Sequence, residues 1–524
     1  MPRLTIDNQE VEVPAGATVL DAARQLGIDI PTLCHMPGMP PATSCMVCVV
    51  KVNDKPRLAP SCALKAEDGM RIQSQCDEVL EARRVALELL LAEHVGDCMG
   101  PCQLICPAGM NIPLMIRQIR AGGLEDASVT VKRHIALPAV LGRVCHAPCE
   151  KGCRRAQADA AVSICLLKRF VADTDLAREQ PYLPVRQATT GKKVAIVGAG
   201  PTGASAAWHL LQEGHAVTII DEQGRPGGML HKIDAGQLAP DVIRAEMDLI
   251  VRLGAEFRLG CRVGADVTLD ELCRDYDAVL LAVGEASPSA GDLAQKAGLA
   301  PQQGKPAVRL AVDRRTFRTS LAGVFAAGGA TRAGKHAVLA VADGQAAACA
   351  IGQFLAGADV TGPVKPFNVS LGKLLEGEIT AFMSSADPAA RTQTQPHQPL
   401  SPAQARDESA RCLHCDCRKA DSCRLRQFSG QYGAKPARYR NRQVAFCQRT
   451  DHPRLVYESG KCIACGICIR IVEQAGQSPG LCFTGRGFGV TVSIPFNGTI
   501  EEAVGGLADQ LVSACPTAAW AYRD

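Results

Sequence analysis

Cysteine is the residue type that dominates the chemistry of this chain. Its 524 residues include 25 cysteines, and most of them fall into compact groups. Residues 1–16 alternate apolar and polar side chains and lack the apolar stretch of a secretory signal, so we expect a cytoplasmic location. Because the cytosol keeps thiols reduced, grouped cysteines there indicate metal ligation rather than disulfides. Four isolated cysteines are instead expected to be buried thiols: Cys76, Cys261, Cys273 and Cys349.

The first cysteine group has the spacing C-x10-C-x2-C-x13-C and consists of Cys34, Cys45, Cys48 and Cys62. A long loop, a close pair and a distant fourth thiolate allow one loop to wrap a small cluster while a neighbouring strand supplies the last ligand. Structural zinc sites more often use two short C-x2-C pairs. The spacing therefore predicts a 2Fe-2S cluster.

The last cysteine group lies near the C-terminal end. Cys462, Cys465 and Cys468 share one loop, and Cys515 follows far downstream, just before a proline. Three cysteines in a loop with a remote Cys-Pro are typical of one 4Fe-4S cluster. A two-cluster ferredoxin would place another cysteine soon after Cys468, where this chain has Val472. We therefore predict a single cluster here and interpret Cys482 as a bystander.

Between these groups lies a third set, at the end of a helical stretch (residues 81–94) and in the segment after it. The stretch delivers a histidine directly to three cysteines, and a further cluster of cysteines follows about forty residues on. Eight ligands suffice for two 4Fe-4S clusters. The candidates are His94, Cys98, Cys102, Cys106, Cys145, Cys149, Cys153 and Cys165.

A fourth set follows a linker rich in Pro, Gln, Ser and Thr. Its spacing, C-x2-C-x-C-x5-C, matches neither a zinc ribbon nor a ferredoxin loop. The spacing is compatible with a 4Fe-4S cluster, with zinc and with no metal. We call this set the cysteine knot; it consists of Cys412, Cys415, Cys417 and Cys423. Cys447 has no partner at ligand spacing.

A dinucleotide fingerprint begins at residue 192. A short apolar strand, three glycines, a helix and a second strand ending in an acid follow one another in the order expected of a Rossmann unit. The glycines let the backbone approach a pyrophosphate, and the acid accepts hydrogen bonds from a ribose. The predicted cofactor-binding residues are Gly198, Gly200, Gly203 and Asp221, followed by Gly227, Gly228, Gly284 and Gly328.

These motifs resemble two families. The 2Fe-2S group, the pair His94 and Cys98, and the segment GRGFGVTVSIPFN resemble the large peripheral iron-sulfur subunit of respiratory complex I and its hydrogenase and formate dehydrogenase relatives. The segments PCQLICPAGMNIP and GRVCHAPCEKGCRR and the Rossmann unit resemble the glutamate synthase small subunit and dihydropyrimidine dehydrogenase. The second resemblance implies FAD rather than NAD in the Rossmann unit and two 4Fe-4S clusters before it.

The second resemblance also implies how the ligands pair, because in that family each cluster draws from both cysteine motifs. Lys168 stands where the family has a Gln or Glu ligand, and a cation does not ligate iron at neutral pH, so Cys165 takes that role. The implied ligand sets are His94, Cys98, Cys102 and Cys153 for one cluster, and Cys106, Cys145, Cys149 and Cys165 for the other.

Two departures from that family bear on the flavin. The family inserts a second Rossmann unit for NADPH, whereas only 28 residues separate Gly284 from Asp313 here, with no second glycine fingerprint. Gly329 also replaces an Asp that contacts the flavin in the family. We therefore expect FAD without a nicotinamide platform.

The predicted fold class is multidomain α/β and α+β. We expect a β-grasp 2Fe-2S ferredoxin domain (1–78), a helical double 4Fe-4S domain (79–188) and a Rossmann-like FAD domain without the NAD(P) insertion (189–365). A linker (366–410), the cysteine knot (411–450) and a ferredoxin-like 4Fe-4S domain (451–524) complete the chain. A hairpin over residues 4–13 and a helix from Thr18 open it.

These features favour an electron-transfer subunit. The net charge of +4 is small and dispersed, and no run of 18 apolar residues occurs, so neither nucleic acid nor a membrane span is expected. The expected partners are an NAD(P)H-binding flavin subunit and a catalytic subunit of the hydrogenase or formate dehydrogenase type. The alternatives are a self-contained NAD(P)H-dependent reductase resembling the glutamate synthase small subunit, and a degenerate scaffold.

Overall fold

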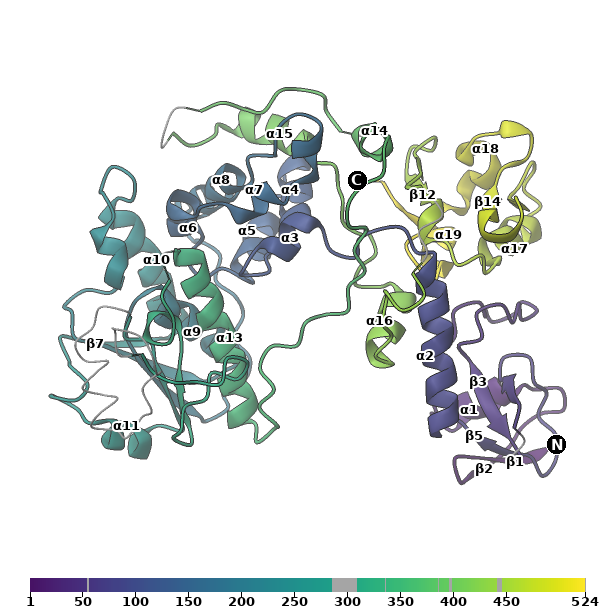
Figure 1. Ribbon diagram of the computed structural model, residues 1–524, viewed down its shortest axis with the longest axis horizontal. Coiled ribbons are helices and arrows are strands. Elements are labelled where there is room, and N and C mark those ends of the chain that lie inside the picture. The colour runs from purple at the N-terminus through teal and green to yellow at the C-terminus, as the bar shows by residue number, and fades with distance from the viewer. Residues whose placement is uncertain are drawn as a thin grey trace. The chain divides into compact units, whose positions relative to one another are not determined.

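The computed structural model describes residues 1–53, 56–284, 309–334, 336–384, 386–394, 398–440 and 445–523. The chain forms two compact units (Figure 1). Unit 1 contains residues 1–100, 366–385 and 413–524, and unit 2 contains residues 101–365 and 386–412. The chain therefore leaves unit 1, builds most of unit 2, and returns twice.

Unit 1 opens with a mixed five-stranded sheet in the order β2-β1-β5-β3-β4. The predicted hairpin is present as β1 (Arg3–Ile6) and β2 (Gln9–Glu12), and the predicted helix as α1 (Val19–Gln25), whose first turn Thr18 caps. The remaining strands are β3 (Val49–Val52), β4 (Leu58–Pro60) and β5 (Arg71–Gln73), and the long helix α2 (Asp77–Ala92) follows.

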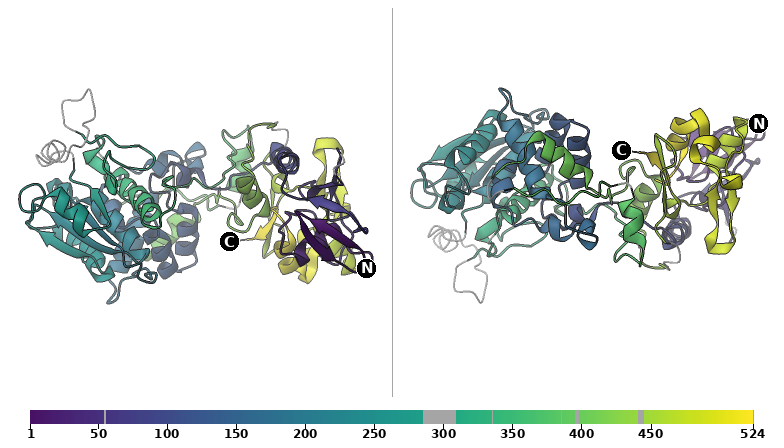
Figure 2. Two further views of the ribbon diagram at one scale, coloured as in Figure 1. Left: turned by 90° about the horizontal axis from the view of Figure 1, so that it is seen from below. Right: turned by 90° about the horizontal axis from the view of Figure 1, so that it is seen from above.

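The rest of unit 1 comes from the returning chain and the C-terminal segment. The strand β12 (Leu455–Glu458) pairs with β15 (Trp520–Tyr522) and with β11 (Gln448–Arg449), and β13 (Cys482–Thr484) pairs with β14 (Thr491–Ser493). The views of Figure 2 show the N-terminal sheet (purple) beside the C-terminal segment (yellow). The helices of this part are α14 (Glu378–Met383), α16 (Arg424–Gln431), α17 (Ile467–Gln474), α18 (Ile500–Val504) and α19 (Ala508–Ala514).

Unit 2 begins with a bundle of short helices. Proline opens several of them, as expected where the first helical residue needs no backbone donor. Their apolar faces meet in one core together with α15, which arrives from the returning chain. The helices are α3 (Pro101–Ile105), α4 (Ile112–Arg120), α5 (Leu124–Lys132), α6 (Pro138–Val144), α7 (Pro148–Lys151), α8 (Ile164–Leu176) and α15 (Pro402–Ala410).

The second half of unit 2 is a five-stranded parallel sheet in the order β10-β9-β6-β7-β8. The strands β6 (Lys193–Val197), β7 (Ala216–Asp221) and β9 (Ala278–Leu281) are largely buried, as is typical of a sheet covered by helices. The edge strands are β8 (Glu256–Leu259) and β10 (Val324–Ala326). The helices are α9 (Pro201–Gln212), α10 (Pro240–Leu253), α11 (Leu269–Asp275) and α13 (Ala337–Leu355).

Helix α13 alone, in the described part of the chain, is long and apolar enough to cross a membrane. Its buried residues include Ala347 and Ile351, which belong to the core around the parallel sheet. A glycine, Gly344, lets it approach α9, since a Cβ there would lie 2.2 Å from the carbonyl oxygen of Thr202. The apolar character of α13 is thus used in core packing.

The segment 366–410, predicted as a linker, contributes structure to both units. Residues 366–385 belong to unit 1 and include α14, whereas residues 386–410 belong to unit 2 and include α15. The expected lack of a nicotinamide unit concerns residues 285–312, most of which lie outside the described residues.

Candidate iron-sulfur pockets and flavin site

The first predicted cysteine group lies together in unit 1. Cys34, Cys45, Cys48 and Cys62 are all buried, and the sulfur atoms of Cys48 and Cys62 lie 3.4 Å apart. Hydrogen bonds from the paired thiols, Cys45 and Cys62, lower the pKa of Cys34 to about 5 and that of Cys48 to about 7. Cys34 and Cys48 thus favour the thiolate form, which is the form that ligates iron, whereas the same hydrogen bonds raise the pKa of Cys45 and of Cys62.

The C-terminal group also converges. Cys462, Cys465, Cys468 and Cys515 line one pocket, which Pro516 and Trp520 help to close. Burial raises the pKa of Cys465 to about 12, so this pocket stabilises thiols rather than free thiolates. Only a cation or a metal cluster compensates buried thiolates there. Cys482 lies on β13 and is not among the residues that line this pocket; its role as a bystander stays a prediction.

A third pocket of unit 1 joins residues that the sequence analysis had separated. His94 and Cys98, from the loop after α2, line it together with Cys417 and Cys423 from the returning chain. The backbone N–H of Cys417 donates to the carbonyl oxygen of Cys98 at 3.3 Å. One histidine and three cysteines therefore surround this site, which we call the His94 pocket.

Local contacts hold the His94 pocket in shape. Cys98 donates its N–H to the carbonyl oxygen of Val369 (3.0 Å), and the N–H of Val369 donates to the Cys98 sulfur at 3.4 Å. The N–H of Leu371 donates to a carboxylate oxygen of Asp97 at 2.7 Å. The first returning segment is therefore the backbone support of this pocket.

The electrostatics of the His94 pocket suit a neutral imidazole. Burial, followed by the positive charge of Lys461, lowers the pKa of His94 to about 4. A neutral imidazole has a free lone pair for a metal. Cys98 and Cys423 are buried, and burial raises the pKa of both thiols.

This arrangement differs from the ligand pairing implied by resemblance. That pairing put His94 and Cys98 with Cys102 and Cys153, but the latter two belong to unit 2. It also treated residues 412–423 as one knot, whereas Cys412 belongs to unit 2 and Cys417 lines the His94 pocket. Cys415 is half-buried and stays a predicted ligand.

The four cysteines of the second implied ligand set all lie in unit 2. Cys106, Cys145, Cys149 and Cys165 line one pocket together with Lys168, and we call it the Cys145 pocket. A hydrogen bond from Cys165 lowers the pKa of Cys145 to about 5. Three further thiols of unit 2, Cys102, Cys153 and Cys412, pack against the same hydrophobic core.

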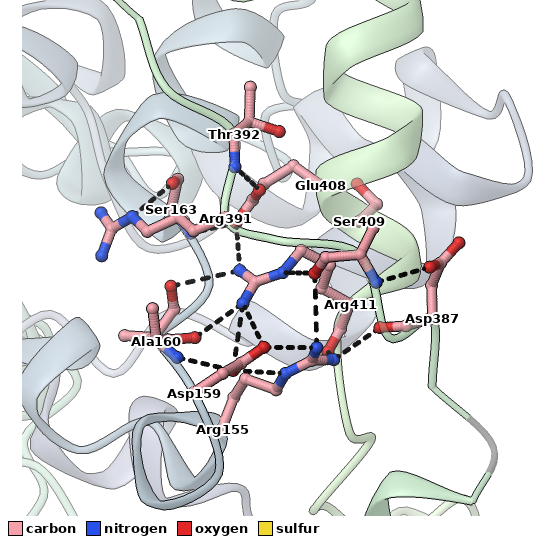
Figure 3. Close-up of polar contacts among 12 residues, drawn as sticks. Arg155, Asp159, Ala160, Ser163, Asp387, Arg391, Thr392, Glu408, Ser409 and Arg411 are labelled. Atoms are coloured by element: carbon pink, nitrogen blue, oxygen red, sulfur yellow. Dashed lines mark hydrogen bonds and ion pairs between the residues drawn. The ribbon is translucent and has the colours of Figure 1, made fainter.

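A buried polar network includes Arg411, the residue that precedes Cys412 in sequence (Figure 3). Arg155 and Arg411 are both almost fully buried, and both donate to Asp159, at 2.7 and 3.2 Å. Arg155 also donates to the carbonyl oxygen of Arg411 at 2.9 Å, and Arg411 pairs with Glu408 at 2.9 Å. Because these arginines are near neighbours of Cys153 and Cys412 in sequence, the network fixes the second returning segment close to the cysteine motif.

In the described part of the chain, no group of three or more His, Cys, Asp or Glu side chains surrounds a single ion. Iron-sulfur clusters distribute their ligands differently, because the ligands bind separate irons of the cluster: one ligand per iron in a 4Fe-4S cluster and two per iron in a 2Fe-2S cluster. The relevant feature is therefore a pocket lined by thiols rather than side chains that meet at one point.

The flavin site is built at the carboxyl ends of β6 and β7. Gly198 has φ +112°, and a Cβ there would lie 2.4 Å from the carbonyl oxygen of Ala282. The Gly200 position faces open space, which leaves room for a pyrophosphate beside the N-terminus of α9. The carboxylate of Asp221 accepts from the N–H of Ala199 at 2.6 Å.

The remaining predicted flavin residues surround the same loop. Gly227 donates its N–H to the carbonyl oxygen of Ala199 at 2.9 Å, and Gly228 lies against Gly200. Gly328 opens the turn after β10 with φ +68°, and a Cβ there would clash with Thr202. Gly284 follows β9 with φ +82°. These features fit a bound dinucleotide.

Family models match three parts of the chain. Residues 2–77 match a 2Fe-2S iron-sulfur cluster binding domain, and residues 76–180 match dihydropyrimidine dehydrogenase domain II with its 4Fe-4S cluster. Residues 163–344 match the pyridine nucleotide-disulphide oxidoreductase family. The chain is therefore of the oxidoreductase class and combines iron-sulfur domains with a flavoprotein-type domain.

Its curated relatives are redox enzyme subunits. The chain is 42% identical over 207 residues to the NADP(+)-dependent formate dehydrogenase subunit beta of Moorella thermoacetica, covering 35% of this chain and 29% of that one. It is 35% identical over 218 residues to the dihydropyrimidine dehydrogenase subunit PreT of Salmonella typhimurium, covering 40% and 52%. It is 36% identical over 182 residues to the glutamate synthase [NADPH] small chain of Bacillus subtilis, covering 34% and 36%. The chain thus spans about half or less of these relatives.

Cysteine spacing alone did not predict that Cys417 and Cys423 line the His94 pocket. The available signal was two half-motifs, His94-x3-Cys98 and Cys417-x5-Cys423, separated by residues 99–416. Spacing rules work along a continuous segment, so a site divided by an inserted unit escapes them.

Proposed function

We propose that this chain is an electron-transfer subunit of a multisubunit cytoplasmic oxidoreductase of the formate dehydrogenase or NAD-linked hydrogenase type. Electrons pass between an NAD(P)H-handling partner, FAD and a terminal catalytic partner. The observation that carries this proposal is that residues of three cysteine pockets share one hydrophobic core of unit 1: Cys34, Cys45, Cys98, Cys423, Cys465 and Cys468. We infer from this shared core that the three pockets relay single electrons.

The proposed cofactors are one 2Fe-2S cluster, 4Fe-4S clusters and one FAD. In unit 1 the 4Fe-4S clusters occupy the C-terminal pocket and the His94 pocket. In unit 2 one cluster occupies the Cys145 pocket, and Cys102, Cys153 and Cys412 supply ligands for another. FAD accepts or donates two electrons and exchanges them singly with the clusters, which is the chemistry these groups supply when bound.

The protein supplies binding and electrostatics rather than substrate chemistry. The glycines after β6 receive the pyrophosphate, Asp221 orients the ribose, and buried thiols hold the iron away from water. We assign no catalytic residue to this chain. The relatives named as subunits support the proposal that substrates are handled by partner proteins.

The test begins with anaerobically purified full-length protein. We expect iron and acid-labile sulfide in amounts that fill the proposed clusters, one FAD per chain, and slow reduction of the isolated chain by NADH or NADPH. Co-purification from the host should recover a flavin subunit and a catalytic subunit. Zinc, or the absence of sulfide, would contradict the iron-sulfur assignment. Rapid bleaching of the isolated flavin by NADPH would favour the self-contained reductase instead.

A further inference from the structure

Lys168, on α8, is a lysine whose side chain lies inside unit 2. Only 5% of the residue is exposed, and it lines the Cys145 pocket beside four thiols. A lysine is rarely buried without a compensating group, because removing an ammonium from water costs several kcal/mol. Its surroundings therefore need an explanation.

The protein itself offers Lys168 little compensation. Its Nζ donates to the carbonyl oxygen of Leu141 at 3.2 Å, and no carboxylate pairs with it in the described part of the chain. Glu150, the acidic residue next to Cys149, pairs instead with Arg391 at 2.7 Å and accepts from the N–H of Cys165 at 3.0 Å. The nearest unused source of negative charge is the set of pocket thiols.

The backbone prevents the ammonium from leaving the pocket easily. Helices α6 and α8 pack so closely that a Cβ on Gly142 would lie 2.7 Å from the Cβ of Arg169, the residue after Lys168. Arg169 itself is anchored by an ion pair with Asp173 at 3.3 Å. The charge is therefore held at a fixed place beside the thiols.

We propose that Lys168 is the built-in counter-charge of the cluster in the Cys145 pocket and raises its reduction potential. This inference rests on the proposed function, in which a 4Fe-4S cluster binds here. A cluster with four thiolates is anionic, and reduction adds one more negative charge. A fixed cation stabilises the reduced state more than the oxidised state, so the equilibrium shifts toward reduction.

The Cys145 pocket is lined in part by a helix of the flavin domain, so a raised reduction potential bears on electron transfer from the flavin. Val338, in the first turn of α13, lines the same pocket, and α13 belongs to the flavin domain. His146, which follows Cys145, stacks on His336 at the start of α13 with ring centroids 3.8 Å apart. A raised potential makes this cluster the favoured acceptor for an electron that leaves the flavin.

The experiment is an EPR-monitored redox titration of the full-length holoprotein. The signal of this cluster is identified as the one lost in Cys145→Ser. In Lys168→Met we expect the midpoint potential of this cluster to become more negative by at least about 59 mV, which corresponds to a tenfold change in the equilibrium constant of a one-electron reduction. Lys168→Arg should retain more than half of the wild-type elevation. Lys151→Met, which removes an exposed lysine from α7, is the matched control. Its one-electron reduction equilibrium constant for this cluster should stay within threefold of the wild-type value.

The outcomes separate this inference from the proposed function. If wild-type protein lacks a signal that depends on Cys145, the proposed cluster fails. If the cluster is present but Lys168→Met shifts no further than Lys151→Met, the counter-charge role of Lys168 fails. If both Lys168→Met and Lys168→Gln lose the cluster, Lys168→Arg is the deciding variant. A cluster retained near the wild-type potential in Lys168→Arg supports the counter-charge role, whereas loss of the cluster shows that only the shape of the side chain matters.

Discussion

The Cys145 pocket and the His94 pocket gather similar ligands but are built in opposite ways. All thiols of the Cys145 pocket come from residues 106–165, a continuous helical segment of unit 2. The His94 pocket takes two of its four candidate ligands from before unit 2 and two from after it. One site thus forms from local helix packing, whereas the other requires the chain to complete a whole unit and return.

This difference has consequences for folding and for cluster assembly. Ligands that are near in sequence meet at a small entropic cost, whereas closing a long loop costs more and depends on the inserted unit being folded. We therefore expect the Cys145 pocket to tolerate damage to the returning chain, and the His94 pocket to depend on it.

The largest expected effect comes from removing a ligand that the returning chain supplies. In Cys417→Ser we expect the loss of one cluster's iron and sulfide from the purified protein, with the Cys145-dependent EPR signal unchanged. The serine oxygen is a poor replacement for a thiolate at iron. Iron and sulfide analysis with EPR measures both. In the reverse experiment, Cys149→Ser should spare the His94-pocket signal.

If Cys417→Ser instead removed the Cys145-dependent signal, the two pockets would not be independent sites. An unchanged iron content in both Cys417→Ser and Cys423→Ser would show that the returning chain supplies no ligand there. Either result would contradict the division of ligands between the units.

The next largest effect concerns the network that fastens the second returning segment. Glu408 and Arg411 form an ion pair in which both side chains are at most 1% exposed. Removing one partner of a buried pair costs about 3–5 kcal/mol, because the other charge stays buried. Glu408→Ala should therefore lower the free energy of unfolding of unit 2 by about that amount, measured by denaturant titration at matched cluster content.

An exposed ion pair of the same unit provides the control for this measurement. Arg178 and Glu125 lie 2.5 Å apart, but their side chains are 41% and 76% exposed. Solvent screens such pairs, so Arg178→Ala should change the free energy of unfolding by less than about 1 kcal/mol. Equal effects of Glu408→Ala and Arg178→Ala would mean that the buried network does not anchor the segment.

The sequence was most informative where a site is local. The cysteines from Cys34 to Cys62 are all buried, the loop Cys462 to Cys468 lines one pocket with Cys515, and Asp221 accepts from the N–H of Ala199 beside Gly198; their roles as ligands stay predictions. Cys165 and Lys168 line the same pocket because both residues lie on one helix, α8; the use of Cys165 as a ligand stays a prediction.

The sequence was least informative where a segment returns from far along the chain and its unit is set by tertiary packing. Cys412 and Cys417 are only five positions apart, yet they belong to different units. Residues 366–410 are rich in loop-forming residues and suggested a linker, but Ala405 packs in a core supplied by other elements and Glu408 is fully buried. No local pattern records which core a short helix will join.

A smaller, pH-dependent effect concerns the support of the Cys145 pocket. Glu246 accepts from the N–H groups of Ala139 and Val140, at 2.7 and 2.8 Å, and thereby holds the start of α6, the helix before Cys145. Burial raises the pKa of Glu246 from its usual value of 4.5 to about 7. The stability contributed by this group is therefore complete below pH 4.5 and is lost as the pH rises through about 7.

Between pH 5.5 and 7.5 we expect the free energy of unfolding of unit 2 to fall by about 2 kcal/mol in the wild type, and by much less in Glu246→Gln, whose amide does not ionise. Denaturant titrations across this range measure the two slopes. Because Gln retains one acceptor but presents an amide to the second N–H, its overall stability should be lower. Parallel slopes in the two proteins would exclude Glu246 as their source.

The smallest expected effect tests whether a thiol outside the pockets matters at all. Cys482 lies on β13 in the same C-terminal segment as the cluster loop, but it does not line the pocket that contains Cys468. Cys482→Ser should leave iron, sulfide and EPR signals unchanged and shift stability by no more than about 0.5 kcal/mol, since it is a half-buried position without ligand geometry. Cys468→Ser, in contrast, should remove one cluster. If Cys482→Ser lost iron as well, proximity along the chain rather than pocket geometry would determine which thiols bind, and the contrast between local and returning sites would lose its basis.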